Sequence, residues 1–401
     1  MLRSSARLLL PLAFIAPLAA SPLRAQRETH KAISIGNYPR VDGIRINFRD
    51  RDLERVRGAN ITMWRPYGEA SGDVSGLALG LPITGAENIT GIGVAAFGIE
   101  ASGRTRGVML AGVGIGGGGE VSGISIAGLG VGSGDGINGI TIAGLGAGSG
   151  GRVSGITIGG LGVAGGGEVR GLAAGGLGVG SGGDARGILV GGLGAGVGGD
   201  IRGMAIGGLG AGTGGNLRGV AVGGIGVAAG GSVRGAVLGG VGAGAGGDLR
   251  GLGVGGVGVG VGGRASGILV GGVGVGAGGG IRGIAVGGVG VGSGGTAHGL
   301  MIGGLGVGAE RLEGVAIAPM VGAGDLHAVV IAPALLRTEK GGRFSGVSIS
   351  SVNAVRGDQR GLSIGIVNYA RSLRGAQLGV VNIVRDNPSG RKVLPIINWG
   401  R

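Results

Sequence analysis

Glycine recurs every 16 residues from Gly107 to Gly299, without a single insertion. A typical unit reads GILVGGLGAGVGGDIR and runs from Gly187 to Arg202. A fixed period is the signature of a repeat architecture, in which one unit cannot bury its apolar side alone and neighbouring units must stack. The period therefore predicts stacked copies of one short element and no separate globular domain.

Looser units flank this regular block. They open upstream at Gly43, Gly58, Gly76 and Gly91, and downstream at Gly314, Ala328, Gly346, Gly361, Gly375 and Arg391. A partial unit near Ala32 brings the expected total to roughly 24 units. The expected divisions are a signal peptide (1–25), irregular N-terminal repeats and a cap (26–106), regular repeats (107–313), and degenerate repeats with a C-terminal cap (314–401).

Within the unit, numbered 1 to 16 from its first glycine, the apolar residues indicate β-strands. They hold positions 2, 4, 7, 9 and 15, occupied above by Ile188, Val190, Leu193, Ala195 and Ile201. A spacing of two is strand periodicity, and a glycine pair at positions 5 and 6 suits a corner because glycine reaches backbone angles closed to other residues. We therefore expect all five positions to face the core. A helix is excluded because glycine costs about 1 kcal/mol per residue in a helix interior.

Composition removes the other fold classes. Glycine supplies 113 of the 401 residues, hydrophobic residues make up 43%, aromatic residues 2%, and cysteine is absent. Collagen needs glycine at every third position, and a disordered linker is more polar than this chain. A globular enzyme of this length needs larger core side chains, and a disulfide scaffold needs cysteine. The sequence thus predicts an all-β, single elongated β-solenoid, roughly 115 Å long at about 4.8 Å per coil.

The N-terminus reads as an export signal. Arg3 and Arg7 precede an apolar run over 8–16, and small residues follow at 19–21. A basic start, a short apolar run and a small-residue exit describe a secretory signal. We expect cleavage after Ala25 and an exported protein at the cell surface, in the outer membrane or in the medium.

Arginine recurs at position 16 of the unit. It occurs at Arg170, Arg186, Arg202, Arg218, Arg234, Arg250 and Arg282. Position 14 is often acidic, as in Glu168 and Asp200. Because position 15 is apolar, both neighbours are expected to point outward on one edge. The arginines are candidates for an interaction ladder that binds anions, and the alternative, which we favour, is a solvated edge where acid and base neutralise each other.

Two other columns carry a pattern. Position 3 is expected to face outward and turns from polar to apolar along the chain, and position 11 mixes serine, threonine, valine and alanine. Such a stripe suits a lateral partner, a membrane surface or a sheet-on-sheet contact, or else needs no partner because its residues are small. Position 8 becomes asparagine near the end, at Asn353, Asn368, Asn382 and Asn398. Stacked asparagine side chains can hydrogen-bond along a ladder.

The sequence predicts no catalytic residue, cofactor or metal. His30, His298 and His327 lack metal-ligand spacing, and G-x-G-x-x-G strings are expected by chance in so much glycine. The formal charge of +14 favours anionic partners, but aromatic residues do not interleave with the basic ones. We therefore expect no nucleic-acid partner.

The last units resemble bacterial surface-repeat proteins built from short G-x-x-[IL]-G-x-[VI]-N units. The match rests on GLSIGIVN from Gly361, GAQLGVVN from Gly375 and LPIIN from Leu394. The resemblance implies an exported surface or envelope protein and carries over no catalytic residue.

These observations predict a non-enzymatic surface or envelope repeat protein that acts as a rigid scaffold or an adhesion surface. Its partner is an envelope surface, a polysaccharide or another protein, and lateral self-association is a further expectation. One alternative is an outer-membrane β-barrel with positions 2 to 11 as the spanning strand. A third is a carbohydrate-active enzyme on a β-helix, which would need clustered carboxylates that the sequence does not display.

Overall fold

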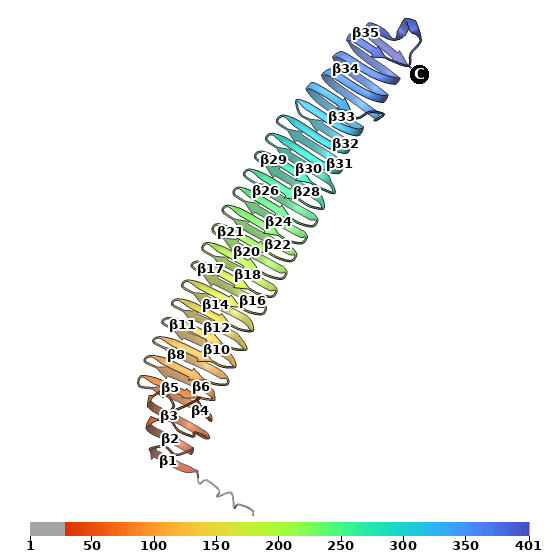
Figure 1. Cartoon of the computed structure of the whole chain (residues 1–401). Coiled ribbons are helices and arrows are strands. Elements are labelled where there is room, and N and C mark those ends of the chain that lie inside the picture. The colour runs from red at the N-terminus through yellow and green to blue at the C-terminus, as the bar shows by residue number, and fades with distance from the viewer. Residues whose placement is uncertain (1–28, 401) are drawn as a thin grey trace, which may run out of the picture.

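The computed structural model describes residues 29–400, so the predicted signal peptide lies outside the described residues. These residues form one long rod with a gentle bend (Figure 1). The rod is a parallel β-solenoid of about 20 turns, with 74% of the residues in strands. No helix among the described residues is long and apolar enough to cross a membrane. The predicted fold class is confirmed.

Each regular coil contains one long and one short strand. The long strands are β4 (Asp73–Gly80), β6 (Asn88–Ala95), β8 (Thr105–Ala111), β10 (Glu120–Ala127), β12 (Gly136–Ala143), β14 (Arg152–Gly159), β16 (Val169–Gly175), β18 (Ala185–Gly191), β20 (Ile201–Gly207), β22 (Leu217–Gly223), β24 (Val233–Gly239), β26 (Leu249–Gly255), β28 (Arg264–Gly271) and β30 (Gly280–Gly287). The short strands are β5 (Ile83–Ala86), β7 (Gly98–Ala101), β9 (Gly114–Gly117), β11 (Gly130–Ser133), β13 (Gly146–Ser149), β15 (Gly162–Gly165), β17 (Gly178–Ser181), β19 (Gly194–Val197), β21 (Gly210–Thr213), β23 (Gly226–Ala229), β25 (Gly242–Ala245), β27 (Gly258–Val261) and β29 (Gly274–Ala277).

The strands at both ends depart from this regular pattern. At the N-terminal end these are β1 (His30–Ile35), β2 (Arg40–Arg49) and β3 (Arg55–Trp64). At the C-terminal end they are β31 (Gly290–Gly303), β32 (Gly306–Ile317), β33 (Met320–Thr338), β34 (Phe344–Val384) and β35 (Val393–Gly400), with a 3-10 turn at Ser389–Arg391.

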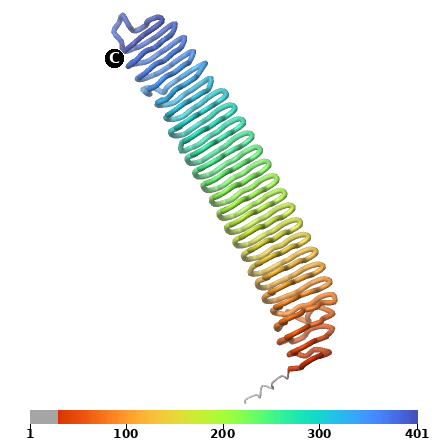
Figure 2. Tube along the Cα trace, turned by 180° about the vertical axis from the view of Figure 1, so that it is seen from behind, coloured from red at the N-terminus to blue at the C-terminus, as the bar shows by residue number. Residues whose placement is uncertain are grey.

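Every regular coil lies directly on its predecessor (Figure 2). Strand β18 pairs in parallel with β16 and β20, and β19 pairs in parallel with β17 and β21. The register places Gly187 between Gly171 and Gly203, one unit away on either side. These parallel pairings differ from the antiparallel neighbours that the membrane-barrel alternative requires.

The core holds positions 3, 9, 11 and 15, which corrects part of the predicted orientation. Positions 9 and 15 face inward as expected, but position 3 is also buried, with Leu189 only 1% exposed. Positions 2 and 4 point outward, with Ile188 41% and Val190 37% exposed, and position 7 is half-exposed. The reason is that the long strand starts at position 15 and alternates without a break through positions 1, 3 and 5.

Glycine at position 1 lies inside this strand and not at a turn. Gly187 has a φ of +126°, and a Cβ at this residue would lie 2.0 Å from the carbonyl oxygen of Gly171. A side chain here would point along the rod into the preceding coil. The glycine that repeats every 16 residues therefore marks a place where the backbones of neighbouring coils lie too close for a side chain.

The largest side chains of the position 3 column lie beside small ones. Leu189 lies between Ala173 and Ala205 in the register. Leu269 extends toward Gly253, where its Cδ2 lies 3.0 Å from the place a Cβ would occupy. A thin core therefore reaches close packing although single units differ in volume.

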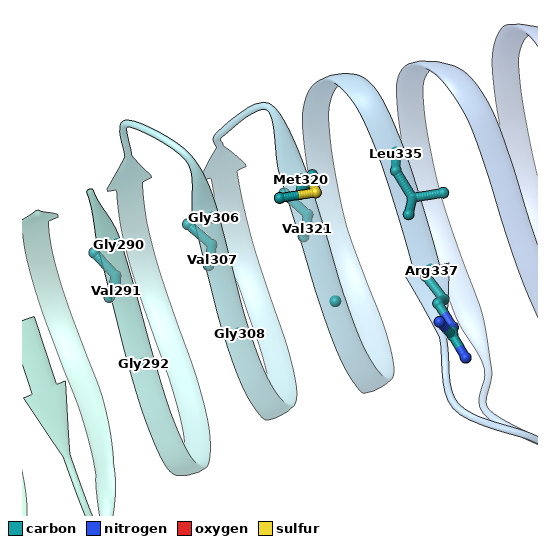
Figure 3. Close-up of a pocket in the computed structure, with 11 residues that line it drawn as sticks. Gly290, Val291, Gly292, Gly306, Val307, Gly308, Met320, Val321, Leu335 and Arg337 are labelled. Atoms are coloured by element: carbon teal, nitrogen blue, oxygen red, sulfur yellow. The ribbon is translucent and has the colours of Figure 1, made fainter. Parts of the chain in front are cut away.

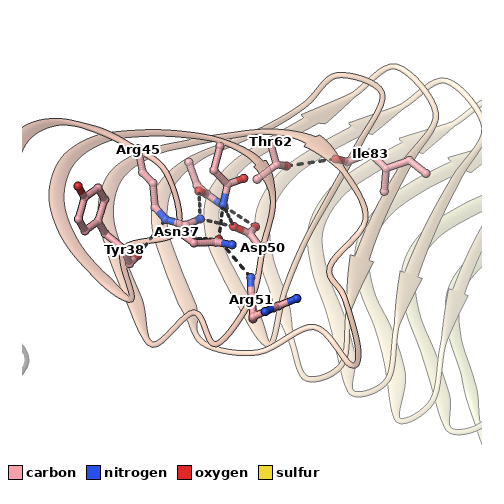
Figure 4. Close-up of polar contacts among 9 residues, drawn as sticks. Asn37, Tyr38, Arg45, Asp50, Arg51, Thr62 and Ile83 are labelled. Carbon is pink, nitrogen blue, oxygen red and sulfur yellow. Dashed lines mark hydrogen bonds and ion pairs between the residues drawn. The ribbon is translucent and has the colours of Figure 1, made fainter.

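A buried polar network fills the core at the N-terminal end (Figure 4). Arg45 is fully buried, and its guanidinium donates to Asp50, to Asn60 Oδ1 at 2.9 Å and to the Tyr38 carbonyl at 3.0 Å. Asn37 Oδ1 accepts a further bond from Arg45 at 3.0 Å. A buried charge requires such partners. The aromatic residues of these first units, Phe48, Trp64 and Tyr67, are exposed instead.

Three of the four C-terminal asparagines form the predicted ladder, but inside the core, whereas Asn398 lies on the reversed strand β35 and donates to the Asn382 backbone carbonyl. Asn353 donates to Asn368 Oδ1, and Asn368 donates to Asn382 Oδ1, both at 2.7 Å. All three are fully buried, and Asn353 pairs in register with the buried Leu336. The corner before Asn353 is one residue shorter than the corner before Leu336. In this unit the eighth residue therefore faces the core, in the place that the ninth residue, Leu336, holds in the preceding coil.

The last segment caps the rod instead of adding a coil. A further unit was expected to open at Arg391, but β35 runs antiparallel to the end of β34, with Gly400 opposite Gly375 and Ile397 opposite Leu378. An exposed parallel edge invites end-to-end growth, and a reversed strand blocks it.

Candidate interaction surface

A column of apolar side chains follows one corner of the solenoid. We call it the corner column; it consists of position 7 residues Phe97, Val113, Leu129, Leu145, Leu161, Leu177, Leu193, Leu209, Ile225, Val241, Val257, Val273, Val289 and Leu305. Each is between 43% and 57% exposed. The backbone ladder continues through this corner, because the Leu193 N–H donates to the Leu177 carbonyl at 2.7 Å. The column therefore keeps a fixed spacing of one residue per coil.

Two more apolar columns lie on the outer face of the long strands. Position 2 presents residues such as Ile156 and Ile188, 43% and 41% exposed, and position 4 presents residues such as Ile158, 40% exposed. Between position 4 and the corner column stand only glycine and alanine, as in Gly191 and Gly192. We call these three columns together the apolar face.

The apolar face is much longer than an ordinary surface patch. Fourteen coils at about 4.8 Å give roughly 65 Å of length. With a width of at least about 10 Å across the strands, its flat area is on the order of 650 Å² before side-chain relief is counted. The largest apolar patch of a typical monomer is about 300–600 Å² and often functional. The apolar residues at positions 2, 4 and 7 predict core, so this face does not follow from the sequence pattern.

The arginines at position 16 form a column beside this face, on the same long strands. Arg170, Arg186, Arg202, Arg218, Arg234 and Arg250 follow one another in register, and Arg282 follows after Ser266. All seven are exposed. We call these seven residues the arginine column, and its outward orientation agrees with the expectation.

At one end of the arginine column a single acid forms ion pairs with two of its members. Glu168 accepts from Arg170 at 2.9 Å and pairs with Arg186 at 3.2 Å. The hydrogen bond from Arg170 lowers the pKa of Glu168, with a smaller contribution from the charges of Arg186 and Arg152. The other five members form no ion pair within 4.0 Å with any residue between 29 and 400. Their charges are therefore available to an external partner.

The remaining acids at position 14 bind the backbone instead of the arginines. Asp184 Oδ1 accepts the N–H of Asp200 at 2.9 Å, and Asp200 Oδ1 accepts the N–H of Asn216 at 2.7 Å. Asp248 and Arg264 repeat this contact at 2.8 Å. The hydrogen bond from the Asn216 N–H lowers the pKa of Asp200. These acids stabilise the turn between coils, which is a structural role.

The outer face of the short strands is almost free of side chains. A Cβ built at Gly196 would find no atom within 4 Å, and several other position 10 glycines are equally open. Beside them, Leu145, Leu161 and Leu177 border a shallow apolar groove of about 630 Å³. This glycine face suits close approach of a flat apolar surface, and Glu100 stands on it in register with Gly85 and Gly116.

The glycine face ends near the C-terminal coils. Gly306 pairs in register with Met320, and Leu335 and Arg337 stand on the next coil. These side chains close a groove of about 520 Å³ (Figure 3). Arg337 is the charged side chain in the lining of this groove. No carboxylate or histidine of the described residues lines the groove.

No arrangement of metal ligands is found in the described part of the chain. No three histidine or acidic side chains converge there. His298 contacts Glu313 across 3.4 Å on the surface, and both continue the row of arginines in the register.

Comparisons with protein-family models, with curated protein sequences and with solved structures give no match.

Proposed function

We propose that the chain is an exported, non-enzymatic repeat protein of the cell surface or envelope, a rigid scaffold whose long side is an interaction surface. The observation that carries the proposal is the unbroken apolar face beside an arginine column. Exposing so much apolar surface in water is unfavourable, and a surface that remains exposed over fourteen coils is best explained by a partner that covers it.

Rigidity supports the scaffold role. Each coil contacts its two neighbours along both strands, and backbone ladders continue through the corner between them. Stability in such a stack is a sum of unit and nearest-neighbour terms, so length can be added without loss of order. A stiff rod keeps its columns in line and presents them together to one partner.

Fractionation of the native host tests the proposal. The expected result is a processed chain in the envelope or medium, and material on the membrane that is released by carbonate. A full-length chain confined to the cytosol would contradict export. Release of products from a panel of glycans by the purified protein would contradict the non-enzymatic role.

A further inference from the structure

We propose that the rod lies lengthwise on an anionic phospholipid surface, with the apolar face inserted and the arginine column at the level of the headgroups. This inference deepens the proposed function and rests on it, because it names the partner of the same surface. The order of the columns, their dimensions, their charge and the poor fit of a second copy support it.

The columns stand in the order that a lipid interface requires. Going along a long strand and around the corner, the outward residues of one unit are Arg186, Ile188, Val190 and Leu193. Charge therefore stands at one edge and apolar side chains at the other. No polar side chain interrupts the apolar positions. This is the amphipathic pattern of elements that lie in the plane of a membrane interface.

The dimensions agree with an interfacial position. Positions 16 and 4 are four residues apart, or roughly 13 Å along a strand. Interfacial elements insert their apolar face about 5–10 Å into the boundary between headgroups and acyl chains. With the apolar face laid flat on this boundary, the arginines stand along one edge of the inserted face, and their long stems allow the guanidinium groups to reach back to the phosphates.

The charge of the column favours an anionic surface. Arg202, Arg218, Arg234 and Arg250 repeat once per coil, at about 4.8 Å between backbones. They have no acidic partner within 4.0 Å among the described residues. Like charges aligned on neighbouring strands repel one another, and an array of phosphates relieves that repulsion with charge-assisted hydrogen bonds. The formal charge of the whole chain, +14, acts in the same direction.

A second copy of the chain fits this face less well. If two rods pair face to face in opposite directions, symmetry places one arginine column against the other. If they pair in the same direction, each arginine column opposes the partner's corner column, so its charges are buried against apolar side chains. A lipid surface meets both kinds of column with the matching chemistry.

Vesicle co-sedimentation with the signal-free chain tests the proposal. We expect binding to vesicles of phosphatidylglycerol and phosphatidylcholine, and at least 100-fold weaker partitioning when Arg202, Arg218, Arg234 and Arg250 are all changed to Gln. The matched control changes Arg65, Lys340, Arg356 and Arg385 to Gln. It removes the same net charge outside the column and is expected to lose much less binding.

Insertion of the corner column is tested by fluorescence. Leu209→Trp places a probe in the corner column, and Gly196→Trp places one on the glycine face, where there is open space. The wild-type chain, with Trp64 and Trp399, supplies the background. We expect a blue shift and quenching by brominated lipid for Leu209→Trp and not for Gly196→Trp. Circular dichroism of each variant checks that the strands are retained.

Several results would overturn the inference. Equal partitioning of the two quadruple variants, equal binding to pure phosphatidylcholine, or an unchanged Leu209→Trp spectrum on bound vesicles would each do so. A lipid-free dimer that Leu193→Ser and Leu209→Ser abolish would assign the face to a second copy instead. Any of these results, with the native chain still found in the envelope, removes the lipid partner and leaves the proposed function intact.

Discussion

Asp200 Oδ1 accepts the backbone N–H of Asn216, one coil later, at 2.7 Å. Asn216 Oδ1 in turn accepts the N–H of Ser232 at 2.9 Å. The side chain at position 14 thus supplies the acceptor for the next coil's backbone at the turn. Aspartate, asparagine and serine are interchangeable here because each offers an oxygen at the same place.

This contact predicts which of two substitutions at Asp200 lowers the free energy of unfolding more. Asp200→Ala removes the acceptor and leaves the Asn216 N–H without its partner, at an expected cost of about 1 kcal/mol in the free energy of unfolding. Asp200→Asn keeps an oxygen at the same place and is expected to cost less than half as much. Urea unfolding of both variants measures the difference. Equal losses would show that the acceptor contributes nothing.

Acid is expected to weaken the rod through three carboxylates. The pKa values of Asp200 and Asp325 are lowered mainly by hydrogen bonds from the backbone, and that of Glu168 by a hydrogen bond from Arg170. A carboxylate whose pKa is lower in the folded chain stabilises it above the unfolded pKa, about 4. That stability is lost as the pH falls through the folded pKa.

The urea midpoint should therefore be constant between pH 7 and pH 5 and fall below about pH 4. The triple variant Glu168→Gln, Asp200→Asn, Asp325→Asn lacks these titrations and should show a smaller decrease between pH 5 and pH 3. A decrease equal to that of the wild-type chain would assign the acid sensitivity to other groups.

Two glycines of one coil should respond very differently to the same substitution. Gly187 has a φ of +126° and lies against the Gly171 carbonyl, whereas a Cβ at Gly196 would find no atom within 4 Å. Gly187→Ala is expected to cost about 3 kcal/mol or more through strain and collision, and Gly196→Ala less than about 1 kcal/mol. Urea unfolding measures both, and a similar cost for the two would refute this role of position 1.

The 16-residue period was sufficient to predict the parallel stack. It identified Gly187 and its equivalents, and an uninterrupted period of glycines requires that every coil meet its neighbour at the same place. The outward arginines also followed from the sequence, because the apolar residue at position 15, such as Ile201, is buried beside them. These predictions depend on repetition, which a single sequence displays directly.

The orientation of the other apolar residues could not be obtained by pattern alone. Both Ile188 and Leu189 are apolar, so hydrophobicity does not distinguish the outward from the inward face of β18. Counting in steps of two from Ala185 would have placed Leu189 inside. The prediction placed positions 2 and 4 inside together with position 15, which is out of step with this count. A face covered by lipid or by a partner looks like core in a sequence, because both exclude water.

The asparagine ladder permits a prediction about buried polar groups. Asn368 donates to Asn382 and accepts from Asn353, and all three are fully buried. Asn368→Val takes the side-chain donor from two acceptors, Asn382 Oδ1 and the Leu378 carbonyl, and is expected to cost about 3 kcal/mol. Changing all three asparagines to Val removes the whole set of side-chain bonds and fills the same column with apolar groups, so the triple variant should be no less stable than the single one. Urea unfolding compares the two, with Val355→Ala as a control for an ordinary core cavity in the same coils. A triple variant that loses three times as much as Asn368→Val would show that the ladder stabilises each coil independently, contrary to this prediction.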